Sequence, residues 1–306
     1  MTIPSRITQR LMVGNSLASL QNGLGRLART QEQLHTGRVI NRPSDSPIGT
    51  NNAMRLRSEA AAQSQYARNA EDGLGWLGQV DNTLMSMTDS VRRTRNLALQ
   101  GASTGNSPQA SREALAAEVE QIREALVSAA NTRYLGRPVF GGTTAGKVAY
   151  DPATAAFVGV PVAEPVPAPG TTVERTVADG VRVRVDVTGP EAFGPPGDDL
   201  FKTLDDVVRH LRTDPTALGG DLDKLDAALT RMQTALTEVG TRYGRLEQAA
   251  QSAKDVTLDL QASLSEVENV DMAKAMVDLQ LQEVAYQASL ATTARVLQPS
   301  LIDFLR

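Results

Sequence analysis

The chain of 306 residues contains no cysteine and only two histidines. The absence of cysteine excludes disulfide bonds, thiolate metal sites and cysteine nucleophiles. His35 and His210 are 175 positions apart, so a zinc or di-iron site built on histidine is not expected. No Ser-His-Asp set or comparable catalytic group can be recognised. We therefore expect neither an enzyme nor a bound cofactor or metal.

Aromatic side chains are also scarce, at 4% of the residues, and no apolar run reaches the roughly 18 residues of a membrane-spanning helix. The N-terminus has no apolar stretch of the kind found in a cleaved secretory signal. We therefore expect a soluble chain, whose export from the cell would need a route without such a signal. The basic residues are scattered without interleaved aromatics, which argues against binding of nucleic acid.

The formal charge of −4 is unevenly divided along the chain. Residues 1–150 carry 17 Lys and Arg against 11 Asp and Glu, whereas residues 151–306 carry 14 against 24. The resulting net charges of +6 and −10 could favour pairing of the two halves, within one chain or between neighbours. Ordinary solvated helix faces would give the same numbers, so charge alone does not choose between the two interpretations.

Apolar residues at helical spacing are abundant. From Leu222 to Val267, 14 positions keep an unbroken alternation of three- and four-residue steps, and only Thr257 among them is polar. This period of 3.5 predicts one long helix with a narrow apolar seam. At 1.5 Å per residue the helix would be about 69 Å long, and only other long helices could bury its seam. The function is therefore expected to lie in assembly rather than in a pocket.

Shorter stripes with the same spacing occupy residues 17–34, 77–98 and 115–129 in the N-terminal half. The last two of these stripes could fold back beside the long seam. Three glycines precede or interrupt the second stripe: Gly73, Gly75 and Gly78. Each glycine weakens a helix by about 1 kcal/mol relative to alanine, so their presence suggests a close approach of two helices or a bend. Two helix starts carry serine as N-cap with proline after it: Ser46-Pro47 and Ser107-Pro108.

The last 35 residues form two adjacent apolar stripes on one predicted helix, and the second stripe is Val277, Leu281, Val284, Ala288 and Ala291. Together the stripes make a face wider than one partner helix would cover. A membrane-surface helix is disfavoured, because residues 266–306 carry three Lys and Arg against six acids. We predict an assembly interface from residues at both ends of the chain: Leu17, Leu20, Leu24, Leu27, Leu34, Met276, Leu279, Tyr286, Leu290 and Leu297.

The middle of the chain differs in composition, since residues 135–220 hold 10 of the 15 prolines and 12 of the 24 glycines. Strict alternation over Val181–Val187 predicts a half-buried strand, with Thr171–Val177 as its partner across an Asp179-Gly180 turn. The segment Gly141–Lys147 begins like a phosphate-binding loop, but Val148 follows where that loop needs Ser or Thr. We interpret it as a glycine-rich turn.

Two acidic pairs could be proposed as acid–base or calcium groups, but their setting is that of helix first turns: Asp198-Asp199 and Asp205-Asp206. His35 and His210 are interpreted as exposed residues near helix ends. The predicted class is mainly α with a small β-rich insertion, a long antiparallel helical bundle whose terminal helices pair on assembly. The predicted domains are 1–45 with 266–306, 46–135 with 221–265, and the β-rich 136–220.

Several ordered strings resemble the bacterial flagellin family. Residues 33–47, QLHTGRVINRPSDSP, are similar to its N-terminal signature, in the variant found in proteins of the hook–filament junction. Residues 69–73 and 91–100 continue in the family order, and residues 268–273 and 300–305 are similar to its C-terminal signature. The match covers roughly 1–142 and 222–306; His35 and Ser46 depart from it. Its signature residues here are Gly37, Asn41, Pro43, Ser44 and Asp45.

The resemblance implies a flagellin-like fold and a structural role at the junction of flagellar hook and filament. It further implies export through the flagellar type III apparatus without a cleaved signal. The implied partners are a hook-associated protein on one side, flagellin on the other, copies of the chain itself, and an export chaperone. A flagellin filament subunit remains an alternative, as does a coiled-coil adhesin or phage-tail component. Residues 91–100 also resemble the stretch by which flagellins meet an innate immune receptor.

Overall fold

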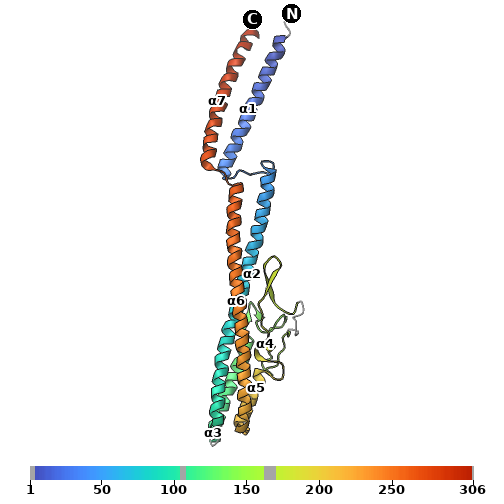
Figure 1. The fold of residues 1–306 in the computed structure, drawn as a ribbon. Coiled ribbons are helices and arrows are strands. Elements are labelled where there is room, and N and C mark those ends of the chain that lie inside the picture. The colour runs from blue at the N-terminus through green and yellow to red at the C-terminus, as the bar shows by residue number, and fades with distance from the viewer. Residues whose placement is uncertain (1–3, 104–107, 162–169, 305–306) are drawn as a thin grey trace. The chain divides into compact units, whose positions relative to one another are not determined.

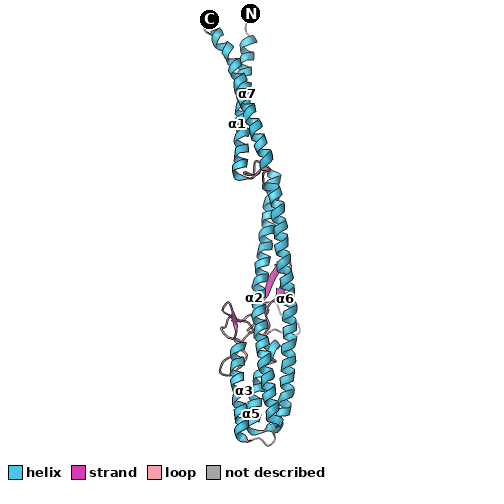
Figure 2. Cartoon of the chain, turned by 90° about the vertical axis from the view of Figure 1, so that its left-hand side faces the viewer, coloured by secondary structure: helices cyan, strands magenta, loops and turns pink. Residues whose placement is uncertain are grey.

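The computed structural model describes residues 4–103, 108–161 and 170–304, and helices dominate them (Figure 2). The helices are α1 (Pro4–Thr36), α2 (Pro47–Ser103), α3 (Gln109–Ala130), α4 (Gly189–Phe193), α5 (Leu200–Thr213), α6 (Leu218–Glu268) and α7 (Met272–Phe304), with a 3-10 turn at Pro215–Ala217. The strands are β1 (Arg133–Tyr134), β2 (Arg137–Pro138), β3 (Glu174–Ala178) and β4 (Val181–Arg184). The predicted class, mainly α with a small β-rich insertion, is confirmed.

The chain forms two compact units. Unit 1 comprises residues 1–61 and 258–306, and unit 2 comprises residues 62–257. Unit 2 therefore includes both the insertion and the bundle around it. The division into three domains that we drew from the sequence stays a prediction.

The long apolar seam of α6 forms part of the core of unit 2, where α2 and α6 run side by side (Figure 1). Within unit 2, Tyr243 is the exposed member of the predicted seam, at 40%. The stripes at 77–98 and 115–129 share this core, so the predicted fold-back is confirmed. The buried seam residues are Leu225, Leu229, Met232, Val239, Leu246, Ala250 and Ala253.

Two of the three glycines in α2 mark close approaches. A side chain at Gly73 would meet Leu246 of α6, with 2.8 Å between its Cβ and the leucine Cδ1. At Gly75 a Cβ would lie 2.9 Å from the Tyr134 ring. Gly78 is different, because a Cβ there would have no neighbour within 4 Å. The first two glycines are explained by packing, whereas packing within unit 2 does not explain Gly78.

The insertion has an aromatic core, although aromatic residues are scarce in the chain as a whole. Rings in this core meet edge to face, with centroids 4.8 Å apart for Tyr150 and Phe201 and 5.1 Å for Phe140 and Phe193. Such contacts add to the stabilisation from burial. Burial raises the pKa of Tyr150, with a smaller contribution from Asp199. Four of the five phenylalanines lie in this cluster: Phe140, Phe157, Phe193 and Phe201.

The predicted hairpin is present as antiparallel β3 and β4, but β4 is shorter than expected. It ends at Arg184, and the next three residues are buried outside the ladder. The predicted strand extended to Val187, where alternation would turn Asp186 to the solvent side, but the Asp186 side chain is fully buried. Once the ladder ends, the two-residue period no longer decides which side chains face the core.

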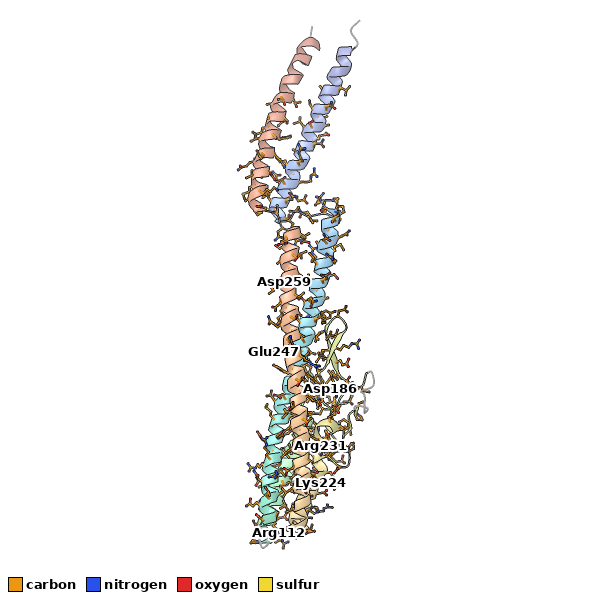
Figure 3. The ribbon with its side chains drawn as sticks, viewed as in Figure 1. Arg112, Asp186, Lys224, Arg231, Glu247 and Asp259 are labelled. Carbon is orange, nitrogen blue, oxygen red and sulfur yellow. The ribbon has the colours of Figure 1, made fainter. Side chains whose placement is uncertain are left out.

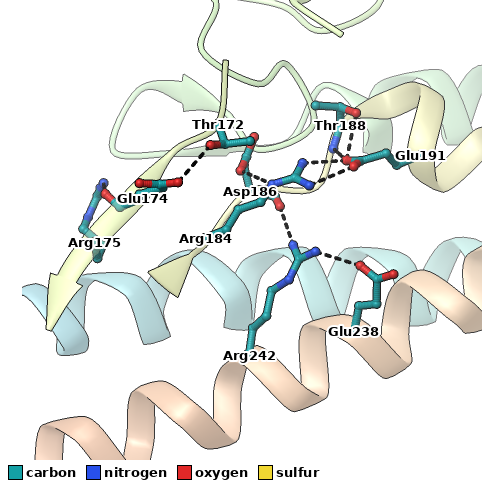
Figure 4. A network of polar contacts seen from close by, with 9 residues as sticks. All are labelled: Thr172, Glu174, Arg175, Arg184, Asp186, Thr188, Glu191, Glu238 and Arg242. Carbon is teal, nitrogen blue, oxygen red and sulfur yellow. Dashed lines mark hydrogen bonds and ion pairs between the residues drawn. The ribbon is translucent and has the colours of Figure 1, made fainter. Parts of the chain in front are cut away.

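Asp186 is buried within a network of ion pairs (Figure 4). Arg184 donates from Nε to Asp186 at 2.8 Å and binds both carboxylate oxygens of Glu191 at 2.8 and 2.7 Å. Glu191 also accepts from the backbone and hydroxyl of Thr188, the N-cap of α4. Arg242 of α6 donates to the Asp186 carbonyl at 2.9 Å, which ties the insertion to the bundle. Figure 3 labels Asp186 in the insertion and Arg231 on α6, in the region where the insertion lies beside that helix.

The two acids of this network are shifted in opposite directions. Burial raises the pKa of Asp186, and the hydrogen bond from Arg184 only partly opposes that shift. Burial also acts to raise the pKa of Glu191, but the hydrogen bonds from Arg184 and the Thr188 backbone outweigh it. The pKa of Glu191 therefore lies below its usual value.

The helix-start predictions have mixed outcomes. The Ser46 hydroxyl caps α2 by accepting from the Gly49 backbone amide at 3.1 Å, and the Asp199 carboxylate caps α5 by accepting from the Lys202 backbone amide at 2.9 Å. Pro108 is itself the N-cap of α3, one position after the predicted one, and Ser107 lies outside the described residues.

The two histidines lie in different surroundings. His35 is exposed, as predicted. The same prediction for His210 was wrong, because its Nδ1 lies 2.6 Å from the buried carboxylate of Asp221, across the turn between α5 and α6. The sequence alone gives no signal for this pairing, since Asp221 is an ordinary acid in the first turn of a helix.

Candidate assembly surface

The helices α1 and α7 pack antiparallel along one seam of unit 1 (Figure 1). Thr30 donates to the Gln282 side chain at 3.1 Å, and Gly23 lies beside the ring of Tyr286, which would be in ordinary contact, at 3.5 Å, with a Cβ at that position. The less exposed positions recur with steps of three and four on both helices. They are Ser16, Leu20, Gly23, Leu27, Thr30 and Leu34 on α1, and Ala275, Leu279, Gln282, Tyr286, Ser289 and Thr293 on α7.

Polar and small residues make up more than half of this seam. Apolar area removed from water contributes roughly 25 cal/mol per Å², so Ser, Thr, Gln and Gly contribute less than Leu would. A two-helix pair with such a seam is weakly held, because helix stability in proteins comes mostly from the packing of an apolar face.

The predicted residues of α1 are divided between two surfaces. Leu20, Leu27 and Leu34 lie on the seam with α7. Leu17 and Leu24 point away from it and are 56% and 52% exposed. The predicted stripe and the observed seam have the same three- and four-residue steps, and they share every second position, here Leu20, Leu27 and Leu34. The positions of the leucines alone therefore do not determine which of two neighbouring helix faces packs against α7.

The predicted residues of α7 are divided in the same way. Leu279 and Tyr286 face α1, whereas Met276 and Leu290 are 56% and 45% exposed. Leu297 lies in α7, but its side chain is outside the described residues.

A third surface of α7 was not among the predicted interface residues. Val277, Leu281 and Val284 are 56%, 64% and 65% exposed and form one stripe, which Ala288 and Ala291 extend. Nine residues, about two and a half turns, separate Val277 from Tyr286, so this stripe lies opposite the seam. The sequence did contain a sign of this surface, namely the second apolar stripe. That stripe showed that the apolar face of the helix is wide, but it did not show which of the two stripes would stay uncovered.

Helix α7 thus has an exposed apolar face opposite the mixed polar and apolar face that α1 covers. Helices that are apolar on several sides are normally buried on those sides. A contiguous exposed apolar strip marks an interaction site in a soluble protein. The arrangement suits a helix that other helices surround in an assembly.

The family-signature loop between α1 and α2 closes on itself. Gly37 follows α1 with φ of +71°, a left-handed conformation that suits glycine. The carboxylate of Asp45 accepts from the backbone amides of Asn41 and Arg42 at 3.1 and 2.8 Å. Pro43 and Ser44 are exposed in the turn that this carboxylate holds. These residues therefore shape the loop, whether or not they also contact a partner.

The same loop is attached to the junction of α6 and α7. The Val39 amide donates to the Glu268 carbonyl at 2.7 Å, and the Val270 amide donates to the Gly37 carbonyl at 2.9 Å. The buried Glu268 carboxylate pairs with Arg57 of α2 at 2.6 Å. These bonds order the base of the α1–α7 pair, where its two connections meet.

Residues 91–100 use two of their arginines inside unit 2. Arg93 binds Glu118 of α3 at 2.6 Å, and Arg95 binds both oxygens of Asp226 of α6 at 2.6 and 3.0 Å. Within the described ranges, no group of three or more potential metal ligands comes together. No helix in the described part of the chain has the length and apolarity to cross a membrane.

We predict that the terminal helices exchange their amide hydrogens much faster than the bundle in a dilute solution of the chain. The weak seam of unit 1 contrasts with the seam of α6, most of which is buried in the core of unit 2. Hydrogen exchange read by mass spectrometry should show little protection over residues 5–34 and 272–304 and strong protection over 225–253. Equal, strong protection of both regions would contradict this.

In a comparison with known proteins, the helical segments at both ends of the chain match family models. The family model of the bacterial flagellin N-terminal helical region matches residues 7–145, and that of the C-terminal helical region matches 222–305. The chain is 25% identical over 305 residues to flagellar hook-associated protein 3 of Salmonella typhimurium, covering 94% of this chain and 95% of that protein. It is 27% identical over 300 residues to the flagellar filament 33 kDa core protein of Treponema phagedenis, covering 96% and 95%.

A solved structure shares the fold. The structure described as a "putative flagellar hook-associated protein" from Vibrio parahaemolyticus superposes with a TM-score of 0.64 at 21% identity, and the match covers 74% of this chain and all of that one. The two family models together span most of the sequence, with one at each end. The chain belongs to the bacterial flagellin family.

Proposed function

We propose that this chain is a structural subunit of the bacterial flagellum that joins the hook to the filament. The observation that carries the proposal is the second, uncovered apolar face of α7, at Val277, Leu281 and Val284. A monomer gains nothing from this face, whereas a helical polymer buries it between subunits. The Arg-Pro-Ser-Asp variant of the N-terminal signature, at residues 42–45, favours the junction over the filament proper. Overall identity does not separate the two, at 25% to hook-associated protein 3 and 27% to a filament core protein.

The proposed partners follow from that position. A hook-associated protein would contact the chain on the hook side, flagellin on the filament side, and copies of the chain within its own layer. Before assembly, an export chaperone would cover the C-terminal helix. Export through the flagellar apparatus, without a cleaved signal, places the mature chain outside the cell.

Deletion of the gene in its source bacterium tests this proposal. Cells should build hooks that lack filaments and should release flagellin into the medium, and the wild-type gene should restore filaments and motility. A filament subunit is the rival, and the purified chain distinguishes the two. Long filaments grown from the pure chain alone would identify a flagellin and overturn the junction role.

A further inference from the structure

The hairpin of β1 and β2 ends in an unusual turn. Its two turn residues, Leu135 and Gly136, have φ of +47° and +82°. Glycine, asparagine and aspartate suit such a turn, whereas a leucine with positive φ is disfavoured. Leu135 is also 79% exposed. In the isolated chain this residue combines backbone strain with an exposed apolar side chain, so its advantage should lie in a contact outside the chain.

The hairpin is held firmly enough to present this residue at a fixed place. Tyr134 meets the buried Trp76 of α2 edge to face, with centroids 5.8 Å apart, and occupies the space that Gly75 leaves open. The guanidinium of Arg137 lies 5.7 Å from the centre of the Trp76 ring. Arg133 donates to the Gly136 carbonyl at 2.9 Å across the turn.

The tip is basic on both sides of the leucine. Arg133 and Arg137 are exposed, and neither has an acidic partner within 4.0 Å in the part of the chain that the structure describes. The tip therefore presents an apolar side chain between two cationic ones. Its complement would be an apolar side chain between two carboxylates.

Helix α2 carries such a patch. Met85 is 53% exposed, and Asp81 and Asp89 lie one turn before and after it on the same face. Asp81 has no ion pair among the described residues, and Asp89 has only an exposed pair with Arg92 of its own helix. Gly78 continues this face, and a Cβ there would have no neighbour within 4 Å in the described part of the chain, so the surface is open at this point.

The tip and the patch lie on different sides of α2, since Met85 is turned by about 80° from Gly75, which lies under Tyr134 of the hairpin. Nine residues, about two and a half turns, separate Trp76 under the hairpin from Met85. The two surfaces therefore cannot meet within one chain. If they meet between chains, each copy offers one surface to the copy before it and the other to the copy after it. Such head-to-tail contacts continue into a ring or a helix.

We propose that Leu135 of one copy packs against Met85 and Gly78 of α2 in the next copy, with Arg133 and Arg137 facing Asp81 and Asp89. This contact deepens the proposed function, on which it rests, by naming the surfaces that join neighbouring subunits of the junction layer. It accounts for the strained leucine, for Arg133, Arg137 and Asp81, which have no ion pair among the described residues, and for the glycine that packing within unit 2 does not explain.

Cross-linking between introduced cysteines tests the contact, because the wild-type chain contains none. Cells producing the double variant Leu135→Cys with Met85→Cys should yield flagella in which a short bismaleimide links the chain into dimers and a ladder of higher multiples. The single variants should stay monomeric. The matched control is Leu135→Cys with Tyr243→Cys, which places the second thiol at an exposed apolar position of α6 and should give no ladder.

A substitution at the turn distinguishes the effect of backbone strain at Leu135 from the effect of the proposed contact between copies. Leu135→Asn suits the left-handed backbone, so the free chain should melt at the same or a higher temperature. The self-contact should weaken about tenfold, as for loss of one interface anchor, and shear should detach filaments more readily. Val181→Asn, at the exposed edge of the other hairpin, should change neither property.

The outcomes distinguish this contact from the junction role itself. Absence of the ladder, with shear resistance unchanged in Leu135→Asn, would overturn the contact while gene deletion could still confirm the junction. A cross-link from position 135 to another flagellar protein, identified by mass spectrometry, would assign the tip to that protein instead. A wild-type chain that is missing from the junction would overturn the function irrespective of the tip.

Discussion

Val284→Asp should leave the free chain folded and should prevent its incorporation into the flagellum. Val284 is 65% exposed and lies at the centre of the uncovered face of α7, so a carboxylate there stays hydrated in the monomer. On assembly the same carboxylate would be buried without a partner, at a cost of several kcal/mol in each subunit. Leu290→Asp should act in the same direction. Cells carrying either variant should produce hooks without filaments.

Gln287→Glu is the control, because it adds the same charge to an exposed polar position at the edge of the stripe, on the side of α7 that already carries the exposed Glu283. It should support filament formation at the wild-type level. Thermal unfolding of the purified variants should be within about 1 °C of wild type for unit 2, since surface substitutions typically change stability by less than about 0.5 kcal/mol. Normal filaments in cells with Val284→Asp would show that this face is not an assembly surface.

Arg184→Met should destabilise unit 2 by about 3 kcal/mol at pH 7, because it removes one partner of a buried ion pair. Asp186 would remain fully buried without its guanidinium partner, and Glu191 would lose two hydrogen bonds. Denaturant unfolding followed by tryptophan fluorescence measures the difference. Arg182→Met is the control on the same strand, since Arg182 is 71% exposed and its carboxylate contact is 3.8 Å long. It should change stability by less than about 0.5 kcal/mol.

The loss in Arg184→Met should also depend on pH. Burial already raises the pKa of Asp186, and removal of the guanidinium should raise it further, so the variant loses stability as pH rises above the unfolded value near 4. The lowered pKa of Glu191 gives the wild type stability above that same pH, which the variant lacks. Both effects enlarge the difference with rising pH. A difference that stays constant between pH 4 and pH 7 would contradict the assigned network.

The long helices could be predicted from the sequence because an apolar period of 3.5, sustained over many turns, matches the repeat of packed helices and not that of strands. The α6 seam was accordingly found almost complete, with Tyr243 as the exposed member in unit 2. The sequence could not show that Leu20 faces α7 whereas Leu17 is exposed. The α1–α7 seam includes Ser16 and Thr30, and a pattern of apolar residues does not identify such polar seam positions. That choice depends on the partner helix rather than on α1 itself.

The insertion was harder to predict because its contacts join residues far apart in the sequence. The position of Asp186 depends on Arg242 of α6, 56 residues away, and on the point where the ladder of β4 stops. Leu135 carried a signal in the sequence, a leucine before glycine in a short turn, but its exposure and backbone angle needed the structure. For the assembly surface, the pattern showed that an apolar face exists and the packing showed which face is free.

The position of Trp76 gives the chain a built-in optical probe. It is the only tryptophan, it is 1% exposed, and it lies against the hairpin that carries Leu135. Its emission therefore reports on unit 2, whereas circular dichroism in the far ultraviolet also follows the helices of unit 1. Melting of α1 and α7 would be seen by dichroism alone, so a single sample can separate the unfolding of the terminal pair from that of the bundle.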